Sequence, residues 1–177
     1  AKDKDDVVLF LHCDPEDPAA FIDLRDIARQ EGCAHKVIFS GMRFFWGYST
    51  AEMRMIYNLM DVHVLTTTGE GFGIPTIEAM ACSIPTVMTD YTTAREITDN
   101  GDNGLLVKPA VEIYGTWNVK RAFVDTNHFV EQLNKLYYDR KLLKLLGEKA
   151  RKKTLAEYDW SVVVPKWQKL FQEIAFK

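Results

Sequence analysis

The chain has 177 residues, of which 47% are hydrophobic and 27% charged, and its formal net charge at pH 7 is −3. This composition is typical of one ordinary globular domain and excludes a disordered, collagen-like or coiled-coil protein. The mild negative charge, without a run of Lys or Arg, disfavours a protein that binds nucleic acid or an anionic membrane. No apolar stretch reaches about 18 residues, and the charged first residues are unlike a signal peptide.

Short apolar runs alternate with amphipathic segments along the chain, which is typical of strand–helix–strand units around a parallel sheet. Strands are predicted at 7–11, 37–39, 62–65, 84–88 and 105–107. Helices are predicted between 21 and 32, from 49 or 50 to 60, from 75 to 82, around 93–98, and at 125–138, 140–158 and 160–177. The segment 111–124 has mixed signals and is interpreted as a surface insertion. The expected fold class is α/β, a Rossmann-like parallel sheet with helices on both faces.

Two apolar patterns predict where side chains are buried. The run 7–11 is unbroken, as in a strand that is buried on both faces of a sheet. In the last two helices, apolar residues at helical spacing are interpreted as core or interdomain contacts. These residues are Leu142, Leu143, Leu145, Leu146, Trp167, Leu170 and Phe171.

The cysteines indicate a reducing, cytoplasmic location. Cys13, Cys33 and Cys82 are widely spaced and form no Cys-x-x-Cys pair, so we expect reduced thiols that act as small buried core residues. The four histidines have no ligand spacing with one another or with the cysteines. We therefore expect no metal site.

The segment 66–82 is the most informative, because there a strand ends, a glycine-rich loop turns and a helix begins. In open α/β sheets, ligands bind outside the carboxyl ends of the strands. Gly71 and Gly73 let backbone approach a ligand closely, and free N–H groups at the helix start favour an anion such as a diphosphate. Glu70 and Glu78 could each accept two hydrogen bonds from a sugar or ribose diol, which suits a nucleotide sugar. The alternative is a solvated Glu70 and a Glu78 that only interacts with the helix dipole.

These residues also resemble a family. The string from Glu70 to Glu78 resembles the Glu-x7-Glu motif of the retaining GT-B glycosyltransferases, the glycosyltransferase group 1 family, which includes sucrose synthases and many mannosyl- and glucosyltransferases. Further segments resemble motifs of the same family, and together they cover nearly the whole chain. These segments are 57–62, 78–87, 96–107 and 158–161.

The resemblance implies roles for individual residues. Glu78 would hold the ribose hydroxyls of the donor nucleotide. Glu70 would be the residue of the catalytic centre, holding hydroxyls of the donor sugar as an orienting group and not as a nucleophile. The backbone of the loop from Gly71 through Phe72 and Gly73 to Ile74 would assist it, and the loop containing Gly41 and Arg43 would border the base. Neither a metal ion nor an organic cofactor is implied.

The resemblance also implies a larger enzyme. Residues 1–177 would be the nucleotide-sugar domain, the C-terminal half of a GT-B fold, with a C-terminal helix at 160–177 and without its first strand or the N-terminal acceptor domain. The whole enzyme would transfer mannose or glucose, with retention of configuration, to a glycan or glycolipid in polysaccharide biosynthesis. Acceptor binding and any peripheral membrane association would depend on the missing domain. We expect the chain alone to bind nucleotide weakly and to transfer no sugar.

Some features depart from the family pattern. Ser83 stands where glycine is usual, and 91–94 replaces a frequent Gly-Gly; an upstream Gly-Arg and Lys that clamp the diphosphate are absent from this chain. Two alternatives to a transferase stay open: a non-catalytic nucleotide-sugar-binding module, against which the intact Glu-x7-Glu motif argues, and an epimerase or phosphorylase of the same fold. An epimerase needs extra acid and base residues, and a phosphorylase typically needs a lysine-bound pyridoxal phosphate. Asp90 and Lys108, at other strand ends, are weaker candidates for the same cleft.

Overall fold

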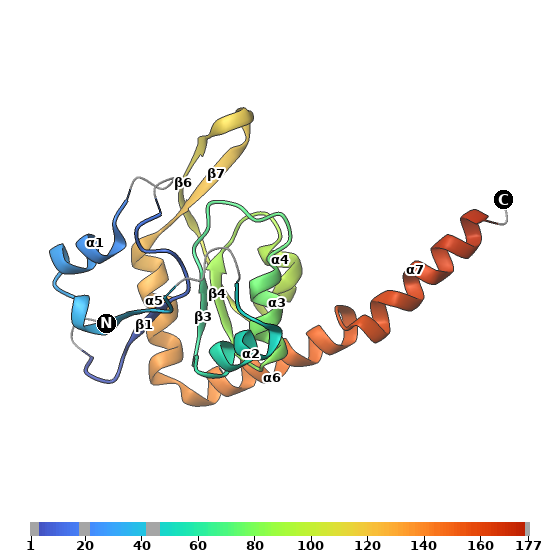
Figure 1. The fold of residues 1–177 in the computed structure, drawn as a ribbon, viewed down its shortest axis with the longest axis horizontal. Coiled ribbons are helices and arrows are strands. Elements are labelled where there is room, and N and C mark those ends of the chain that lie inside the picture. The colour runs from blue at the N-terminus through green and yellow to red at the C-terminus, as the bar shows by residue number, and fades with distance from the viewer. Residues whose placement is uncertain (1–3, 18–21, 42–46, 176–177) are drawn as a thin grey trace. The chain divides into compact units, whose positions relative to one another are not determined.

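The computed structural model describes residues 4–17, 22–41 and 47–175 (Figure 1). The chain divides into two compact units, Ala1–Ala51 and Glu52–Lys177, called unit 1 and unit 2 below.

Unit 1 contains a pair of parallel strands. Its elements are β1 (Leu9–Leu11), α1 (Leu24–Gln30), the 3-10 helix η1 (Ala34–Lys36) and β2 (Val37–Phe39). Leu9 pairs with Val37, which confirms the second predicted strand and shortens the first. The Asp23 carboxylate caps α1, and Gly32 follows the helix with φ +66°. Leu9 is about half exposed, so the prediction of a first strand buried on both faces is wrong.

Unit 2 is built on a three-stranded parallel sheet in the order β3-β4-β5. The strands are β3 (His63–Leu65), β4 (Thr86–Thr89) and β5 (Leu105–Val107). All four residues of β4 are buried, as expected for a central strand covered on both faces. The predicted strands at 62–65, 84–88 and 105–107 are confirmed, with slightly different ends.

Helices cover both faces of this sheet, as predicted (Figure 1). The helices from α2 onward are α2 (Thr50–Asn58), α3 (Ile74–Ala81), α4 (Ala94–Ile97), α5 (Thr126–Tyr138), α6 (Arg140–Glu157) and α7 (Trp160–Ala175), with the 3-10 helix η2 (Asp99–Gly101). Of these, α7 extends away from the sheet (Figure 1). One core cluster joins Val87 and Val107 of the sheet to Leu136 and Leu146. The other cluster joins Met80 of α3, Ile97 of α4 and Ala150 of α6.

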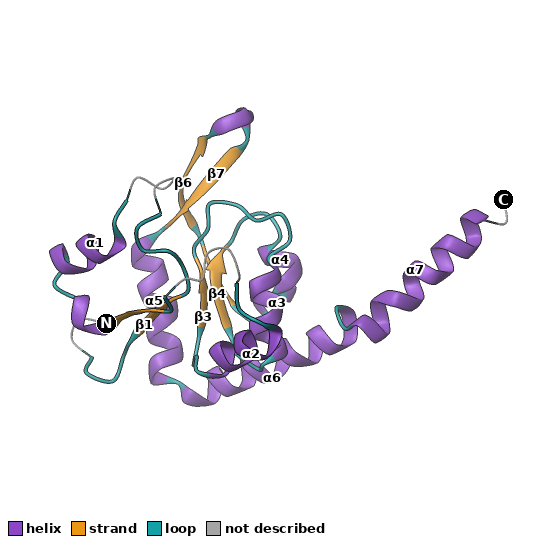
Figure 2. Cartoon of the chain, in the orientation of Figure 1, coloured by secondary structure: helices purple, strands orange, loops and turns teal. Residues whose placement is uncertain are grey.

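The segment interpreted as a surface insertion forms an antiparallel hairpin (Figure 2). Its strands are β6 (Pro109–Tyr114) and β7 (Lys120–Val124), joined by the 3-10 turn η3 (Thr116–Asn118). Trp117 and Asn118 in the turn have φ of +64° and +57°, a conformation uncommon for non-glycine residues. The segment thus has regular structure, as a two-stranded antiparallel sheet.

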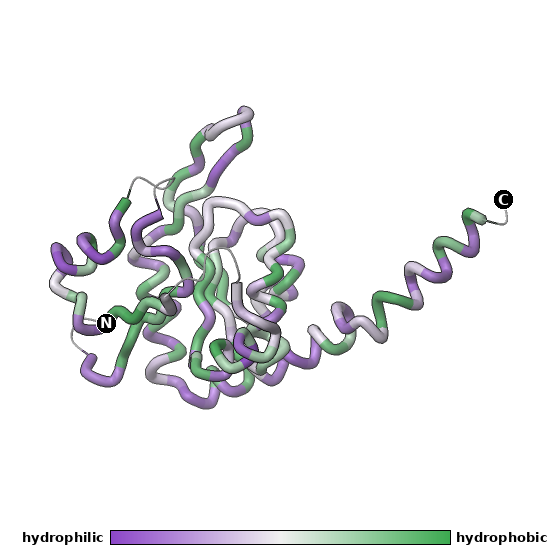
Figure 3. The backbone as a smooth tube through the Cα atoms, viewed as in Figure 1, coloured by the Kyte–Doolittle hydropathy of each residue, from purple (hydrophilic) through white to green (hydrophobic). Residues whose placement is uncertain are grey.

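The last helix, α7, is amphipathic and has no buried residue, with apolar and polar stretches alternating along it (Figure 3). Trp167 and Phe171 are more than half exposed, so they are not part of the core of unit 2. Of the predicted stripe, only Leu146 is fully buried, with Leu142 and Leu143 packed against the core.

The three cysteines are unpaired and partly exposed, so the prediction of buried thiols is wrong. In the part of the chain that the structure describes, no helix combines the length and apolar character needed to cross a membrane.

Candidate functional site

The loop 66–73 connects the carboxyl end of β3 to α3. Gly73 caps the helix with φ +89° and ψ +42°, a left-handed conformation that glycine adopts without strain. An ideal Cβ added there would also lie 3.0 Å from Cδ1 of Ile97. Pro75 sits in the first turn, where its missing N–H costs no hydrogen bond. The sequence therefore turns sharply from strand to helix at this point and leaves the backbone uncovered by a side chain at Gly73.

Backbone N–H groups are available where α3 begins. The N–H groups of Phe72, Gly73 and Ile74 donate to no acceptor among the described residues, whereas those of Thr76 and Ile77 donate to the Gly73 carbonyl. Phe72 and Ile74 are exposed at the surface. Unpaired N–H groups at a helix N-terminus, together with the helix dipole, favour an anion.

Polar hydroxyls also lie close to this turn. Oγ1 of Thr76 and Oγ1 of Thr93 are buried and have no hydrogen-bond partner among the described residues. Both lie within about 4 Å of the position that a Cβ on Gly73 would occupy. Buried polar atoms are normally paired, so two unpaired hydroxyls at one helix start mark this place as unusual.

Glu78 projects from α3 and is exposed, but it is held by one neighbour. The phenol of Tyr57 on α2 donates a 2.8 Å hydrogen bond to Oε2 of Glu78. Burial, followed by the hydrogen bond and the negative charge of Glu78, raises the pKa of Tyr57, so the phenol stays protonated and remains a donor. The carboxylate is thus oriented on one oxygen and keeps acceptor capacity on the other.

Glu70 lies in the loop and is partly buried. Its backbone N–H donates a 3.1 Å hydrogen bond to Oγ1 of Thr92, a residue with φ +49° in the segment that replaces the family's usual glycines. The Glu70 carboxylate has no hydrogen-bond or ion-pair partner within the described ranges, so its oxygens are available to a ligand.

The hairpin contacts the same loop. The N–H of Ala122 on β7 donates a 3.0 Å hydrogen bond to the carbonyl of Thr68, and the Tyr91 phenol donates a 3.0 Å hydrogen bond to the carbonyl of Lys120. An ideal Cβ on Gly69 would lie 3.2 Å from Nη1 of Arg121. A segment interpreted from sequence as a surface insertion is therefore attached to the loop that contains Glu70.

The structure brings six of the predicted site residues together on one loop and helix: Glu70, Gly71, Phe72, Gly73, Ile74 and Glu78. Gly41 lies in unit 1 after β2, with φ +65°, and Arg43 lies outside the described residues. The weaker candidates are engaged in pairs of their own. Asp90 forms a bidentate ion pair with Arg95, and Nζ of Lys108 lies 3.5 Å from the carboxylate of Asp125.

Sequence reasoning missed three residues that contact the motif: Tyr57, Thr92 and Arg121. Tyr57 begins the segment 57–62 that resembles a family motif, so its relation to Glu78 could have been suspected. Thr92 stands in a noted departure from the family pattern. No local signal points to Arg121, because only the return of β7 toward the loop brings it there.

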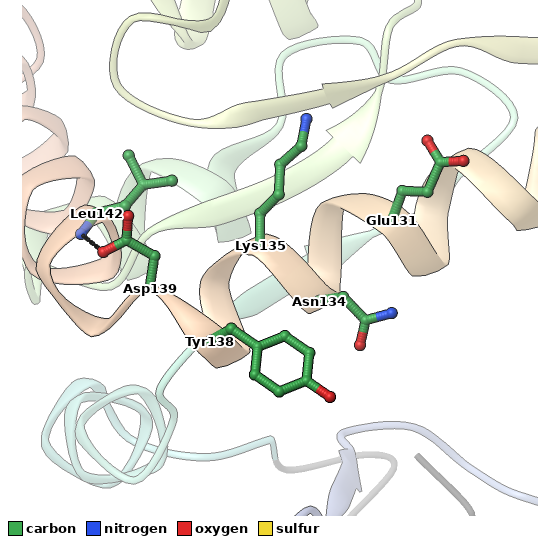
Figure 4. Close-up of a pocket in the computed structure, with 6 residues that line it drawn as sticks. All are labelled: Glu131, Asn134, Lys135, Tyr138, Asp139 and Leu142. Carbon is green, nitrogen blue, oxygen red and sulfur yellow. Dashed lines mark hydrogen bonds between the residues drawn. The ribbon is translucent and has the colours of Figure 1, made fainter.

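The described part of unit 2 has hollows along α5 and beside the motif. The larger, of about 460 Å³, follows α5 and is lined by Glu131, Asn134, Lys135, Tyr138, Asp139 and Leu142 (Figure 4). Its Asp139 carboxylate accepts the N–H of Leu142 and so caps α6, which is a structural role. The second, of about 320 Å³, is apolar and adjoins the motif, with Phe72 edge-on to Tyr158 at 6.0 Å between ring centres.

Over the residues that the structure covers, no group of three His, Cys, Asp or Glu side chains gathers in a form suited to a metal.

The chain is similar to proteins of a known family. The family model described as Glycosyl transferases group 1 matches residues 1–139. The capsular polysaccharide biosynthesis glycosyltransferase CapM of Staphylococcus aureus is 29% identical over 114 residues, which are 64% of this chain and 26% of that protein.

Solved structures share the fold. Anabaena Alr3699/HepE in complex with UDP matches with a TM-score of 0.74 at 21% identity, over 97% of this chain and 41% of that one. Sucrose-phosphate synthase from Thermosynechococcus elongatus matches with a TM-score of 0.74 at 20% identity, over 94% of this chain and 38% of that one. The α/β fold is therefore that of a GT-B glycosyltransferase domain. The chain spans 26% of the capsular relative and about two fifths of each of these structures.

Proposed function

The chain belongs to the group 1 glycosyl transferases, and from this we propose that it is the part of a transferase that binds a nucleoside diphosphate sugar. In the proposed reaction, a larger protein transfers mannose or glucose to a glycan or glycolipid in polysaccharide biosynthesis, with retention at the anomeric carbon. The name of the capsular relative and the UDP complex of the Anabaena protein support this proposal.

One observation supports the proposal most strongly: N–H groups that can bind an anion and two carboxylates lie on the same loop and helix. The three unpaired N–H groups at 72–74 suit a diphosphate, which accepts hydrogen bonds and carries negative charge. Glu70 and Glu78 precede and follow these groups along the chain. Carboxylates accept hydrogen bonds and cannot bind phosphate favourably, so they suit the hydroxyls of the ribose and of the sugar, which lie on either side of the diphosphate.

The proposed roles follow from the contacts of each glutamate. Glu78, fixed on one oxygen by Tyr57, holds the ribose diol, and Glu70 holds hydroxyls of the sugar. Neither acts as a nucleophile; both orient the donor. As the sugar leaves, negative charge grows on the diphosphate, and the N–H groups at the start of α3 stabilise it without a metal ion.

Calorimetry tests the proposal directly. The 177-residue chain is titrated with UDP, GDP, UDP-glucose and GDP-mannose, in buffer with and without EDTA. We expect at least one of these ligands to bind, equally with and without EDTA. Glu78→Ala should weaken that binding by about 1–3 kcal/mol, as for a lost charge-assisted hydrogen bond. Glu148→Ala, which removes an exposed carboxylate on α6, serves as the matched control.

The outcomes separate the alternatives. Absence of binding by every nucleotide would contradict the proposal and favour a structural remnant of a transferase. Equal effects of Glu78→Ala and Glu148→Ala would contradict the role of Glu78. The chain alone is proposed to transfer no sugar, so detectable turnover by these residues would contradict that part. In a larger active protein, proton NMR of the first product would show the anomeric configuration, and inversion would contradict the proposed retention.

A further inference from the structure

We propose that Arg121, on the hairpin, is an additional donor-binding residue that contacts the terminal phosphate of the nucleotide diphosphate. This inference rests on the proposed function, because it concerns the same donor site. It assigns a role to a segment that lies outside every motif described above.

The position of the guanidinium is the first argument. Nη1 of Arg121 lies 3.2 Å from where a Cβ on Gly69 would be, so it faces the backbone just before Glu70. Gly69 is three residues from Phe72, the first of the unpaired N–H groups, and three residues of chain span no more than about 11 Å. The guanidinium therefore lies beside the same short loop that carries the N–H groups, and Glu70 stands between them in the sequence.

The side chain is directed to this place by its surroundings. An ideal Cβ on Gly115 would lie 3.0 Å from Cγ of Arg121, so the glycine leaves room for the aliphatic stem. The hydrogen bond from Ala122 to Thr68 fixes the next residue of β7 against the loop. The lack of a side chain at both Gly115 and Gly69 thus opens a path from the hairpin to the motif loop.

The positive charge of Arg121 also has no neutralising carboxylate among the described residues. Among residues 4–17, 22–41 and 47–175, no carboxylate forms an ion pair with its guanidinium, and the residue is only partly buried. A guanidinium is permanently charged and presents several donors in a plane that matches phosphate oxygens. Its neighbour Lys120 differs, because Nζ of Lys120 lies 3.6 Å from Glu112 and 5.8 Å from the centre of the Tyr114 ring.

A diphosphate is the ligand group that fits this arrangement. The N–H groups at the start of α3 provide partial charges only, and a full positive charge beside them complements the terminal phosphate of the donor. That phosphate gains negative charge when the bond to the sugar breaks. Arg121 is placed to bind the charge in the donor and to stabilise it in the departing nucleotide.

The test compares diphosphates with monophosphates. Calorimetry of the 177-residue chain with UDP, UMP, GDP and GMP is repeated for Arg121→Gln, Arg121→Lys and the control Lys120→Gln. We expect Arg121→Gln to weaken diphosphate binding about tenfold and monophosphate binding less than twofold, as for loss of a charged hydrogen-bond partner. Arg121→Lys should keep most of the diphosphate preference, and Lys120→Gln should change neither affinity.

The outcomes distinguish the two proposals. If the unsubstituted chain binds none of the four nucleotides and neither UDP-glucose nor GDP-mannose, the proposed function fails and this inference fails with it. If it binds only the nucleotide sugars, the inference alone fails. If it binds them and Arg121→Gln leaves diphosphate affinity unchanged, or weakens diphosphate and monophosphate equally, only the role of Arg121 is overturned. Phosphorus NMR of bound UDP provides a second readout on the unsubstituted chain and Arg121→Lys. We expect the terminal phosphorus resonance to differ between the two, and identical resonances would contradict the contact.

Discussion

The phenol of Tyr57 lies 2.8 Å from Oε2 of Glu78, so a buried residue of one helix fixes an exposed carboxylate of the next. The phenol has its pKa raised by burial and by Glu78, so it stays protonated at neutral pH and donates to the carboxylate. This contact orients Glu78 before any ligand arrives, which reduces the conformational freedom that the carboxylate would lose on binding.

Tyr57→Phe removes this hydrogen bond and keeps the ring. We expect a loss of about 1 kcal/mol in the free energy of unfolding, because Glu78 is exposed and regains water. Nucleotide affinity should fall roughly threefold to tenfold, since the carboxylate is no longer held. Urea denaturation and calorimetry measure the two effects. Tyr114→Phe, at an exposed position of the hairpin, is the control, and equal losses in both variants would contradict the role of Tyr57.

His63 makes the stability of unit 2 dependent on pH. The ring is buried at 7% exposure, and burial lowers the pKa of His63 from 6.5 to about 4. The unfolded chain therefore takes up a proton before the folded one does as the pH falls. Stability contributed by this group is complete above pH 6.5 and is lost as the pH falls from there toward 4.

Between about pH 7.5 and about pH 5, we expect His63 to account for a loss of roughly 2 kcal/mol in the free energy of unfolding. Urea denaturation at both pH values measures the loss, and His63→Gln should show a correspondingly smaller change. The same pH dependence in the variant and in the unsubstituted chain would show that His63 does not cause it.

Ser83→Gly should stabilise the chain. Ser83 has φ +63°, a left-handed conformation that costs a non-glycine residue about 1–2 kcal/mol, partly offset by the greater freedom of glycine when unfolded. We expect a net gain of roughly 0.5–1 kcal/mol, seen as a higher melting temperature. Ser161→Gly, at a helical position of α7, should destabilise instead, and a lower melting temperature for Ser83→Gly would refute this account.

Gly147→Ala should separate α6 from the turn after α3. An ideal Cβ on Gly147 would lie only 2.1 Å from the carbonyl oxygen of Ser83, which is backbone and cannot rotate away. We expect a loss of about 3 kcal/mol or more in the free energy of unfolding, as for severe overpacking. Glu148→Ala on the same helix should have little effect. A tolerated Gly147→Ala, measured by urea denaturation, would contradict this close contact.

Much of the fold could be predicted because it depends on local patterns. The strands at 37–39, 62–65 and 105–107 and the helix starting at Trp160 match the structure closely, since apolar runs and turn residues mark them. The burial of a strand was harder to predict. The unbroken apolar run of β1 includes a half-exposed Leu9, whereas β4 with its two threonines is fully buried, because position in the sheet decides burial.

The candidate site was predictable where its residues are consecutive in the chain. Glu70, Glu78 and the glycines between them form one loop and one helix, so their proximity follows from sequence order. The contacts of Tyr57 and Arg121 come from elements far from the loop in sequence. Arg121 in particular depends on a hairpin whose turn holds Trp117 and Asn118 at positive φ, which is uncommon for a tryptophan.

The hydrogen bond from Ala122 to Thr68 has a consequence for engineering. A loop that must adopt one shape to receive a ligand loses entropy on binding unless the fold has already restricted it. Here the hairpin restricts the loop at Thr68, and its own carbonyl at Lys120 is held by Tyr91. Transplanting residues 66–82 alone into another scaffold would transfer the chemical groups without the hairpin hydrogen bond that restricts the loop. A working graft requires the hairpin as well.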